Sequence, residues 1–301
     1  MAALKSIKLK IKSVEKTAKV TKAMEAVSAA KMRKAQQKAL MGRAYARAAS
    51  AILARVSGAR ELATHPLTSA RPVENSLYIA ITSDKGLAGA LNSAVLRAIV
   101  ADIPSGGSAS VIAVGRKAND FFTAREIPVE TYFPNTDQIT SEFIAELVRT
   151  AASRFASGKV DVVKIAYQNF VSTFEQRPTI RTVFPLSLDE LEAVVEDILP
   201  ARGQFALQPV SKERPVTYTI EPSEEEVLNT ILPKLAGIFV YHALLETQAS
   251  EHSARMVAMK SASDKAKDLT KGLTIQFNKA RQAAITREVS EITGGMEAMA
   301  N

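Results

Sequence analysis

The first 57 residues constrain the fold of this chain more than any other part, because their composition favours one long helix. They are rich in Ala, Lys, Met and Gln, contain no proline, and have no glycine before Gly42, which gives high helix propensity throughout. At about 1.5 Å per residue such a helix would be roughly 80 Å long, more than one compact domain can cover. Small and apolar residues recur along it at steps of three and four: Leu4, Ile7, Ile11, Val14, Ala18 and Thr21. This heptad seam predicts a supercoil against a second helix.

The same stretch is strongly basic. Ten lysines and four arginines are opposed only by Glu15 and Glu25, a net charge of +12 where the whole chain has +8. A basic arm suits an anionic partner, which could be nucleic acid, an anionic membrane or an acidic protein surface. A solvated helix face explains the charge about equally well, so the pattern alone leaves these interpretations open.

The middle of the chain, residues 74–221, has the pattern of an α/β domain. Apolar runs that end near turn residues alternate with helical stretches at 87–102 and 139–156, which favours a largely parallel, Rossmann-like sheet. The apolar runs are 77–81, 111–114 and 160–167, and later strands are expected at 179–184 and 216–220.

Residues 222–301 predict a second long helix. Ser223 and Glu226 form a capping box at its start, and Pro233 is expected to kink or restart it. Its last part carries another heptad seam: Ile285, Val289, Ile292, Met296 and Met299. The two end helices, residues 1–57 and 222–301, are joined through the domain at 74–221 and are expected to form an antiparallel coiled coil. The seam from Leu4 to Thr21 would then lie beside about 269–285.

Few residues suggest catalysis. There is no cysteine, the three histidines lack metal-ligand spacing, and no Walker lysine motif or nucleophile elbow occurs. The segment from Ser83 to Gly89 follows an expected strand and opens a helix, where α/β folds bind phosphate. It lacks the full glycine spacing, so a tight turn is the favoured interpretation. We therefore expect no catalytic residue, no cofactor and no metal. No apolar run reaches the roughly 20 residues that span a bilayer.

Five segments together resemble one family, the gamma subunits of bacterial-like F-type ATP synthases. They are 19–25 (KVTKAME), 30–36 (AKMRKAQ), 83–92 (SDKGLAGALN), 249–260 (ASEHSARMVAMK) and 278–292 (NKARQAAITREVSEI). The last two are the most specific, and the order of all five agrees with the family along the whole chain. The resemblance implies a non-catalytic rotor shaft that couples ion-driven rotation to ATP synthesis or hydrolysis.

The resemblance also implies partners and contact residues. The partners would be three alpha and three beta subunits, an epsilon-type subunit and a ring of c subunits, with no nucleic acid. Arg281 and Gln282 match a hydrogen-bonding latch to a beta subunit, and Tyr218 and Glu221 match the foot that meets the c ring. Positions that match coupling contacts are Met24, Arg255, Thr286, Glu288 and Glu291.

Two other classes of protein compete with this interpretation. A basic coiled-coil adaptor for nucleic acid or anionic membrane would explain the charge, but not the slightly acidic C-terminal helix. A nucleotide-binding α/β enzyme with helical arms would need the missing phosphate motif. Because the family motif starts near residue 4, the sequence leaves no room for a transit peptide. We therefore expect a peripheral protein at the cytoplasmic face of a bacterial inner membrane.

Overall fold

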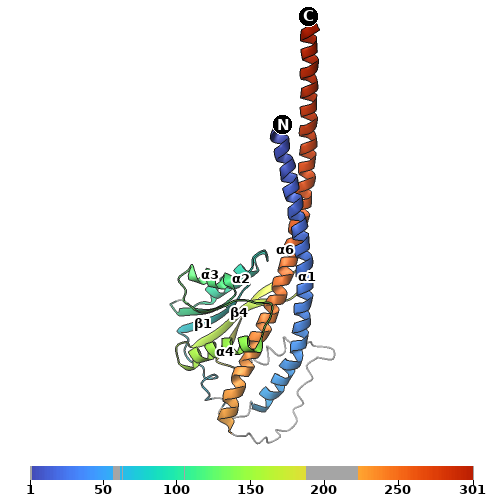
Figure 1. Ribbon diagram of the computed structural model, residues 1–301. Coiled ribbons are helices and arrows are strands. Elements are labelled where there is room, and N and C mark those ends of the chain that lie inside the picture. Colours follow the sequence, from blue (N-terminus) through green and yellow to red (C-terminus); the bar gives the residue numbers. More distant parts are fainter. Residues whose placement is uncertain (1, 57–61, 63, 105, 188–222, 301) are drawn as a thin grey trace. The chain divides into compact units, whose positions relative to one another are not determined.

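A computed structural model describes residues 2–56, 62, 64–104, 106–187 and 223–300. Two very long helices occupy the ends of the chain, α1 (Ala2–Val56) and α6 (Glu224–Ala300), with a sheet between them in sequence (Figure 1). The chain separates into two compact units. We call residues 1–29 with 255–301 the coiled-coil unit and residues 30–254 the α/β unit. The expected division into segments 1–57, 74–221 and 222–301 stays a prediction.

The α/β unit contains a five-stranded sheet in the order β3-β2-β1-β4-β5. The first four strands in that order are parallel, and β5 is antiparallel to β4. The strands are β1 (Asn75–Ile81), β2 (Ser108–Val114), β3 (Val129–Phe133), β4 (Val162–Phe170) and β5 (Gln176–Phe184). Central strand β1 is buried from Ser76 to Ile81, as a strand covered on both faces must be. The α/β class with long end helices is confirmed.

Helices cover both faces of this sheet (Figure 1), and β1 shows how its sequence divides between them. Leu77, Ile79 and Ile81 belong to a core completed by α4 (Ser141–Ala156) and the first part of α6. The intervening Tyr78 and Ala80 face a second core. That second core is completed by α2 (Leu91–Asp102) and α3 (Arg116–Thr123). Alternation along one strand therefore builds two cores.

Two short elements escaped the sequence analysis, strand β3 and helix α3. Their sequences, VETYF and RKANDFFT, are brief and carry charged residues. Periodicity over five to eight residues gives little signal. The expected strand at 216–220 lies outside the described residues.

The first part of α6 is the core helix of the α/β unit. The Ser223 hydroxyl accepts a hydrogen bond from the Glu226 backbone N–H at 3.2 Å, as the capping box predicts. The helix continues through Pro233, so no new helix begins there; Leu232, Leu235 and Ala236 beside it are buried in the core. Among the described residues, α6 alone is long and apolar enough to cross a membrane, but more than half of that window is buried, as in a soluble core helix.

Asp137, in the loop before α4, contacts residues of α1 and α6 within the α/β unit. Lys31 on α1 pairs with its carboxylate, and Lys38 donates to its backbone carbonyl at 3.3 Å. His252 Nε2 lies 3.9 Å from its other oxygen. The hydrogen bond from Lys31 is the main cause that holds the pKa of Asp137 below its usual value. Asp137 thus contacts two helices that are distant from each other in sequence.

Candidate functional site

The coiled-coil unit confirms the heptad seam of the N-terminal helix. Thr21 and Ser28 are buried, and the seam residues before them are half-buried, while the positions between are mostly exposed. The half-buried seam residues are Leu4, Ile7, Ile11, Val14 and Ala18. One stripe of α1 therefore packs against a partner helix, as a period of 3.5 residues requires.

The partner stripe lies on α6 and follows the same period. Met259, Ser263 and Ala266 are buried, and the stripe continues as half-buried residues to Ala280. The Ser263 hydroxyl donates to the Ala18 carbonyl oxygen at 3.4 Å. Within this unit the two helices run side by side in opposite directions (Figure 1). The antiparallel arrangement agrees with the sequence analysis, but the expected register was wrong: with Ala18 at Ser263, the seam from Leu4 to Thr21 lies beside about 260–277, not 269–285.

Beyond Ala280 the helix has no partner among the described residues. Every described side chain from Arg281 to Gly294 is exposed. The second seam is exposed too: Ile285 by 52%, Val289 by 54%, Ile292 by 58% and Met296 by 68%. The first seam reaches only to the residues near 277, where Leu4 lies, and not to Ile285 as expected, so the second seam has no partner helix among the described residues. The end of α6 is thus an amphipathic single helix with an uncovered apolar stripe.

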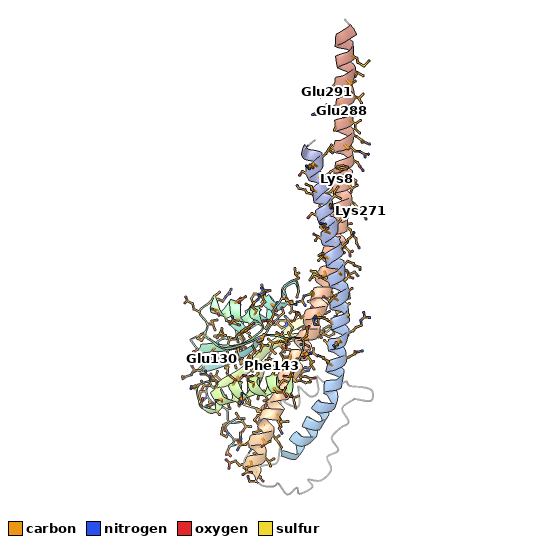
Figure 2. The ribbon with its side chains drawn as sticks, viewed as in Figure 1. Lys8, Glu130, Phe143, Lys271, Glu288 and Glu291 are labelled. Carbon is orange, nitrogen blue, oxygen red and sulfur yellow. The ribbon has the colours of Figure 1, made fainter. Side chains whose placement is uncertain are left out.

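Five of the predicted contact residues lie together on this single helix. Arg281, Gln282, Thr286, Glu288 and Glu291 are all exposed, and Figure 2 shows Glu288 and Glu291 beyond the paired part. The Thr286 hydroxyl donates a hydrogen bond to the backbone carbonyl of Gln282 at 3.0 Å. Because this bond uses only the backbone of Gln282, its side chain can make other contacts. The remaining polar groups face solvent around the apolar stripe.

The other predicted contact residues are placed differently. Met24 is half-buried, and Arg255 is only 8% exposed, so both lie in the paired part of the coiled-coil unit. Tyr218 and Glu221 lie outside the described residues. The structure therefore brings five of the nine predicted residues onto one exposed stretch.

A basic surface accompanies the paired part. Seven lysines between Leu4 and Thr21 or just after it are exposed, whereas Glu15 is the one acidic residue among them. These lysines are Lys5, Lys8, Lys10, Lys12, Lys16, Lys19 and Lys22. Lys22 pairs with Glu25 at 3.1 Å, and Figure 2 shows Lys8 near the level of Lys271. Such a row raises the local positive potential along one helix.

The loop after β1 is held by its own polar groups. The Ser83 N–H donates to the Asn92 side-chain oxygen at 3.0 Å, and the Asn92 amide donates back to the Ser83 hydroxyl at 2.8 Å. Leu87 and Gly89 adopt positive φ angles of 62° and 59°. These two hydrogen bonds satisfy polar groups at the start of the loop. The geometry therefore favours a tight βα turn over a phosphate site.

His65 and His242 make contacts within the fold. His65 accepts from the Leu67 N–H at Nδ1 and therefore donates from Nε2 to Asn229, at 3.0 Å. The ring of His242 packs edge-on against Tyr167. In the described part of the chain no three His, Asp or Glu residues gather in a way that could hold a metal ion.

Some exposed apolar residues were not predicted as contacts. Ile275 on α6 is 70% exposed, and Phe174 in the β4–β5 turn is 82% exposed. Ile275 is an apolar residue outside the heptad seam of α6, and this mismatch in the sequence could have identified it as an exposed contact residue. Phe174 follows Val171 in a short hairpin turn, where local patterns do not distinguish a buried from an exposed aromatic residue.

Comparisons with known proteins identify the family. A family profile described as ATP synthase matches residues 3–299. The chain is 36% identical over 304 residues to an ATP synthase gamma chain from Exiguobacterium, which covers 99% of this chain and 100% of the relative. It is 37% identical over 300 residues to one from Heliobacterium modesticaldum, with the same coverage.

Solved structures share the fold. A chain from the Euglena gracilis mitochondrial ATP synthase matches with a TM-score of 0.67 and 21% identity, covering 99% of this chain and 95% of that one. A chain from the central stalk and c-ring structure of Tetrahymena thermophila mitochondrial ATP synthase matches with a TM-score of 0.60 and 22% identity, covering 81% and 99%. With the full-length sequence matches, these results show that this chain belongs to the gamma chain family of ATP synthases, which form the central rotor shaft of that enzyme.

Proposed function

We propose that this chain transmits rotation between a ring of c subunits and a hexamer of three alpha and three beta subunits, and catalyses no reaction itself. The observation that carries the proposal is the exposed end of α6, from Arg281 to Gly294, with its apolar stripe. An isolated helix of this kind is marginal in water. A sleeve of other subunits would bury the stripe and hold the helix in place.

The apolar stripe supplies a bearing surface rather than a fixed joint. Burying a Val, Ile or Met side chain stabilises an interface by about 1.5–3 kcal/mol, and this burial is non-directional. A helix that turns inside a sleeve can therefore keep apolar contact at many angles. The polar residues that flank the stripe differ around the helix, so each beta subunit would meet a different surface.

The polar residues of this stretch then provide the angle-dependent contacts. Arg281 and Gln282 form the latch to one beta subunit, and Thr286, Glu288 and Glu291 contribute further coupling contacts. Their exposure supports this role. Met24 and Arg255 act within or beside the paired helices, and Arg255 holds that part together rather than reaching outward. Tyr218 and Glu221 form the foot on the c ring.

The lysine row of α1 faces an acidic loop of the beta subunits. Charge complementarity of this kind sets register and speeds association more than it adds affinity. An epsilon-type subunit binds the α/β unit. The assembly places the chain at the cytoplasmic face of a bacterial inner membrane, peripheral to the bilayer through the c ring.

The same lysine row favours a second candidate function, a coiled-coil adaptor for nucleic acid or anionic membrane. Affinity purification of the tagged chain from its own cells separates the two. The shaft predicts co-purification of alpha, beta, epsilon-type and c subunits, with a salt-resistant core and no ATP turnover by the pure chain. Nucleic acid or lipid retained without those subunits, and lost in proportion to added salt, would support the adaptor instead. Sustained ATPase activity of the pure chain would contradict the non-catalytic role.

A further inference from the structure

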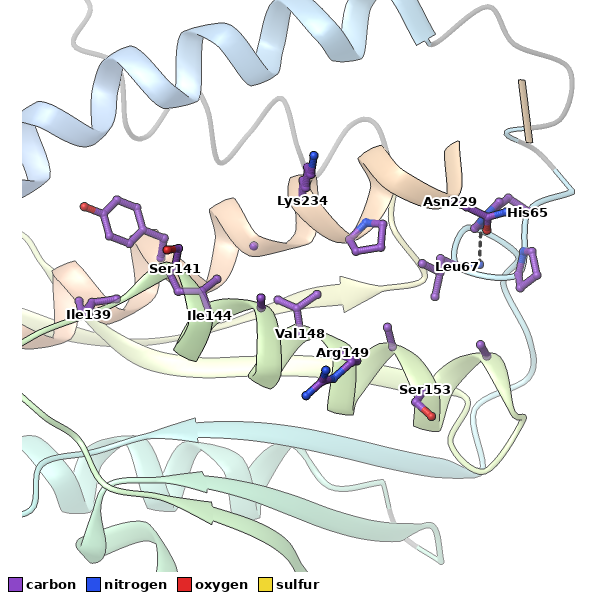
Figure 3. Close-up of a pocket in the computed structure, with 17 residues that line it drawn as sticks. His65, Leu67, Ile139, Ser141, Ile144, Val148, Arg149, Ser153, Asn229 and Lys234 are labelled. Carbon is purple, nitrogen blue, oxygen red and sulfur yellow. Dashed lines mark hydrogen bonds between the residues drawn. The ribbon is translucent and has the colours of Figure 1, made fainter. Parts of the chain in front are cut away.

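A large apolar groove in the α/β unit has no role in the function described above. It lies between α4 and the start of α6 and has a volume of about 1000 Å³ (Figure 3). Among its lining residues, Leu67 and Val148 are buried and Ile144 is half-buried. Burial also raises the pKa of Tyr241, another lining residue, above its ordinary value. An apolar hollow of this size is a candidate binding site.

Helix α6 lines the groove with a row of residues spaced one turn apart. The row consists of Asn229, Pro233, Gly237 and Tyr241. At the helical rise this row is roughly 18 Å long. Rows with a spacing of four residues are the ridges by which one helix packs into the surface of another. The groove therefore has the length and the spacing that suit about three turns of an added helix.

Helix α4 supplies a second row with the same spacing, and its side chains become smaller along the helix. This row runs from Ile144 and Val148 to Ala152 and Ala156. A Cβ added at Gly237 on α6 would lie 3.4 Å from the Ile144 side chain, so the two helices are close at that level. The distance between packed helices depends on the side chains at their contact. The two alanines therefore let the backbone of an added helix approach α4 closely.

The polar groups of the groove do not favour a small polar ligand. At one end, the His65 ring and the Asn229 side chain share a hydrogen bond of 3.0 Å (Figure 3). Among the described side chains, none that lines the groove leaves a buried polar atom without a hydrogen-bond partner. Specific recognition of a small polar molecule depends on such groups. The lining therefore favours an occupant that is held mainly by apolar contact.

The charged groups of the groove are both cations and lie on opposite margins. Arg149 projects from α4 and Lys234 from α6, and Figure 3 shows these side chains pointing away from each other. Both are exposed, and the described lining residues include no Asp or Glu. Neither cation has an ion-pair partner within 4 Å among the described residues. The single headgroup of an anionic lipid would meet one margin, whereas a helix with acids on both flanks of its apolar face would meet both.

The uncovered helix of this chain does not match the charge of the groove. The end of α6 is exposed and amphipathic, but Arg281 and Arg287 lie beside Glu288 and Glu291. Mixed charge on that helix does not complement two cations. A different polypeptide is therefore a better occupant than a second copy of this chain.

We propose that the groove binds an amphipathic helix of a different polypeptide, with acidic residues on both flanks of its apolar face. The apolar face packs between α4 and α6, and the acids pair with Arg149 and Lys234. Exposed pairs of this kind select the partner more than they add affinity. None of the described contact residues proposed above lines the groove. The inference therefore does not rest on the rotor role, and its tests measure binding in the groove rather than coupling.

Binding of a synthetic peptide to the purified full chain tests the charge complementarity. The probe is a fluorescent helix-forming peptide with leucine along one face and glutamate on both flanks, and its counterpart has lysine instead of glutamate. Fluorescence anisotropy should show at least about tenfold tighter binding of the glutamate peptide. The variant with Arg149→Glu and Lys234→Glu should reverse this preference, because both margins of its groove are acidic.

The matched control changes two exposed cations that do not line the groove, Arg97 on α2 and Lys159 after α4. The variant with Arg97→Glu and Lys159→Glu has the same net charge as the groove variant, so it should keep the preference of the parent chain. A preference that reverses in both double variants, or in neither, would overturn the proposal.

Photo-cross-linking in the assembled complex identifies the occupant. A photoreactive benzoylphenylalanine replaces Ala152 in the groove or, as the control, Glu146, which lies outside the groove on the same helix. The complex is isolated through the tagged chain and irradiated, and the cross-linked peptides are sequenced by mass spectrometry. Position 152 should yield a peptide of another polypeptide with helically spaced apolar residues and flanking acids, and position 146 should not. Adducts at position 152 with lipid, with this chain or with a basic peptide would overturn the proposal, as would a yield no higher than at position 146.

Discussion

The hydroxyl of Ser263 on α6 donates a hydrogen bond to the backbone carbonyl of Ala18 on α1, at 3.4 Å. A hydroxyl can reach a carbonyl on another helix only where small residues let the backbones approach. Ala18 and Ser263 are both small, and Thr21 nearby is buried too. This contact therefore marks the register of the antiparallel pair.

That register can be tested by cross-linking. The variant with Ala18→Cys and Ser263→Cys should form a disulfide readily, because only facing positions bring Cα atoms within about 4.4–6.8 Å. The variant with Ala18→Cys and Thr270→Cys displaces one thiol by roughly 10 Å along the helix and should not. Electrophoresis with and without reductant measures both. Preferential closure of the second pair would restore the register expected from the sequence.

Replacing Arg281 and Gln282 together by Ala should weaken coupling and leave the fold unchanged. Both side chains are exposed on a helix, where Ala is well tolerated. Loss of a charge-assisted hydrogen bond to a partner costs about 1.5–3 kcal/mol. The measurement is ATP-driven ion pumping relative to ATP hydrolysis in the reconstituted enzyme, with Lys279→Ala as a neighbouring control. Full pumping by the double variant would show that these residues are not the latch.

Gly115 should be intolerant of substitution. Its φ is +94°, and an added Cβ would lie 2.1 Å from the backbone oxygen of Thr82, so Gly115→Ala must displace backbone at the end of β2. We expect a loss of at least about 3 kcal/mol, or roughly 10 °C in Tm. Gly106→Ala is the control, because its φ is +84° with open space around it. Gly106→Ala should therefore lose only the free energy of placing a non-glycine residue at a positive φ, about 1–2 kcal/mol. Similar Tm values for the two variants would contradict the steric argument.

Asp161 should contribute stability that depends on pH. Its carboxylate accepts the backbone N–H groups of Asn75 at 2.8 Å and Glu74 at 3.1 Å, and the Asn75 bond is the main cause of its lowered pKa. A lowered pKa stabilises the fold above the ordinary value, near 3.9, and this contribution is lost as pH falls below it.

Thermal unfolding measures the effect. Asp161→Ala should lower Tm by roughly 2–4 °C at pH 7, and the difference from the parent should shrink below about pH 4. Asp161→Asn keeps an acceptor oxygen but cannot titrate, so its Tm should depend less on pH in the same range. A difference between the parent and the Ala variant that stays constant down to pH 3 would rule out the titration of this carboxylate.

The sequence alone determined the architecture because its strongest signals are long. The first fifty residues have a helix-favouring composition and a heptad seam from Leu4 to Thr21. Together these features predict a long helix that packs against a second helix. The apolar run from Leu77 to Ile81 needs cover on both faces, which predicts a central strand of an α/β sheet. The motif around Arg281 and Gln282 was specific enough to indicate the family.

Tertiary structure alone decided the register and the exposure of the candidate site. A heptad pattern repeats every seven residues, so both seams could pair in several registers with equal agreement. The contact between Ala18 and Ser263 selects one of them, and that choice leaves Ile285 and Val289 exposed rather than buried. The groove between α4 and α6 joins residues more than eighty positions apart, such as Ile144 and Gly237. Local periodicity cannot predict the contact between α4 and α6, because the two helices come together only when both pack on the same sheet.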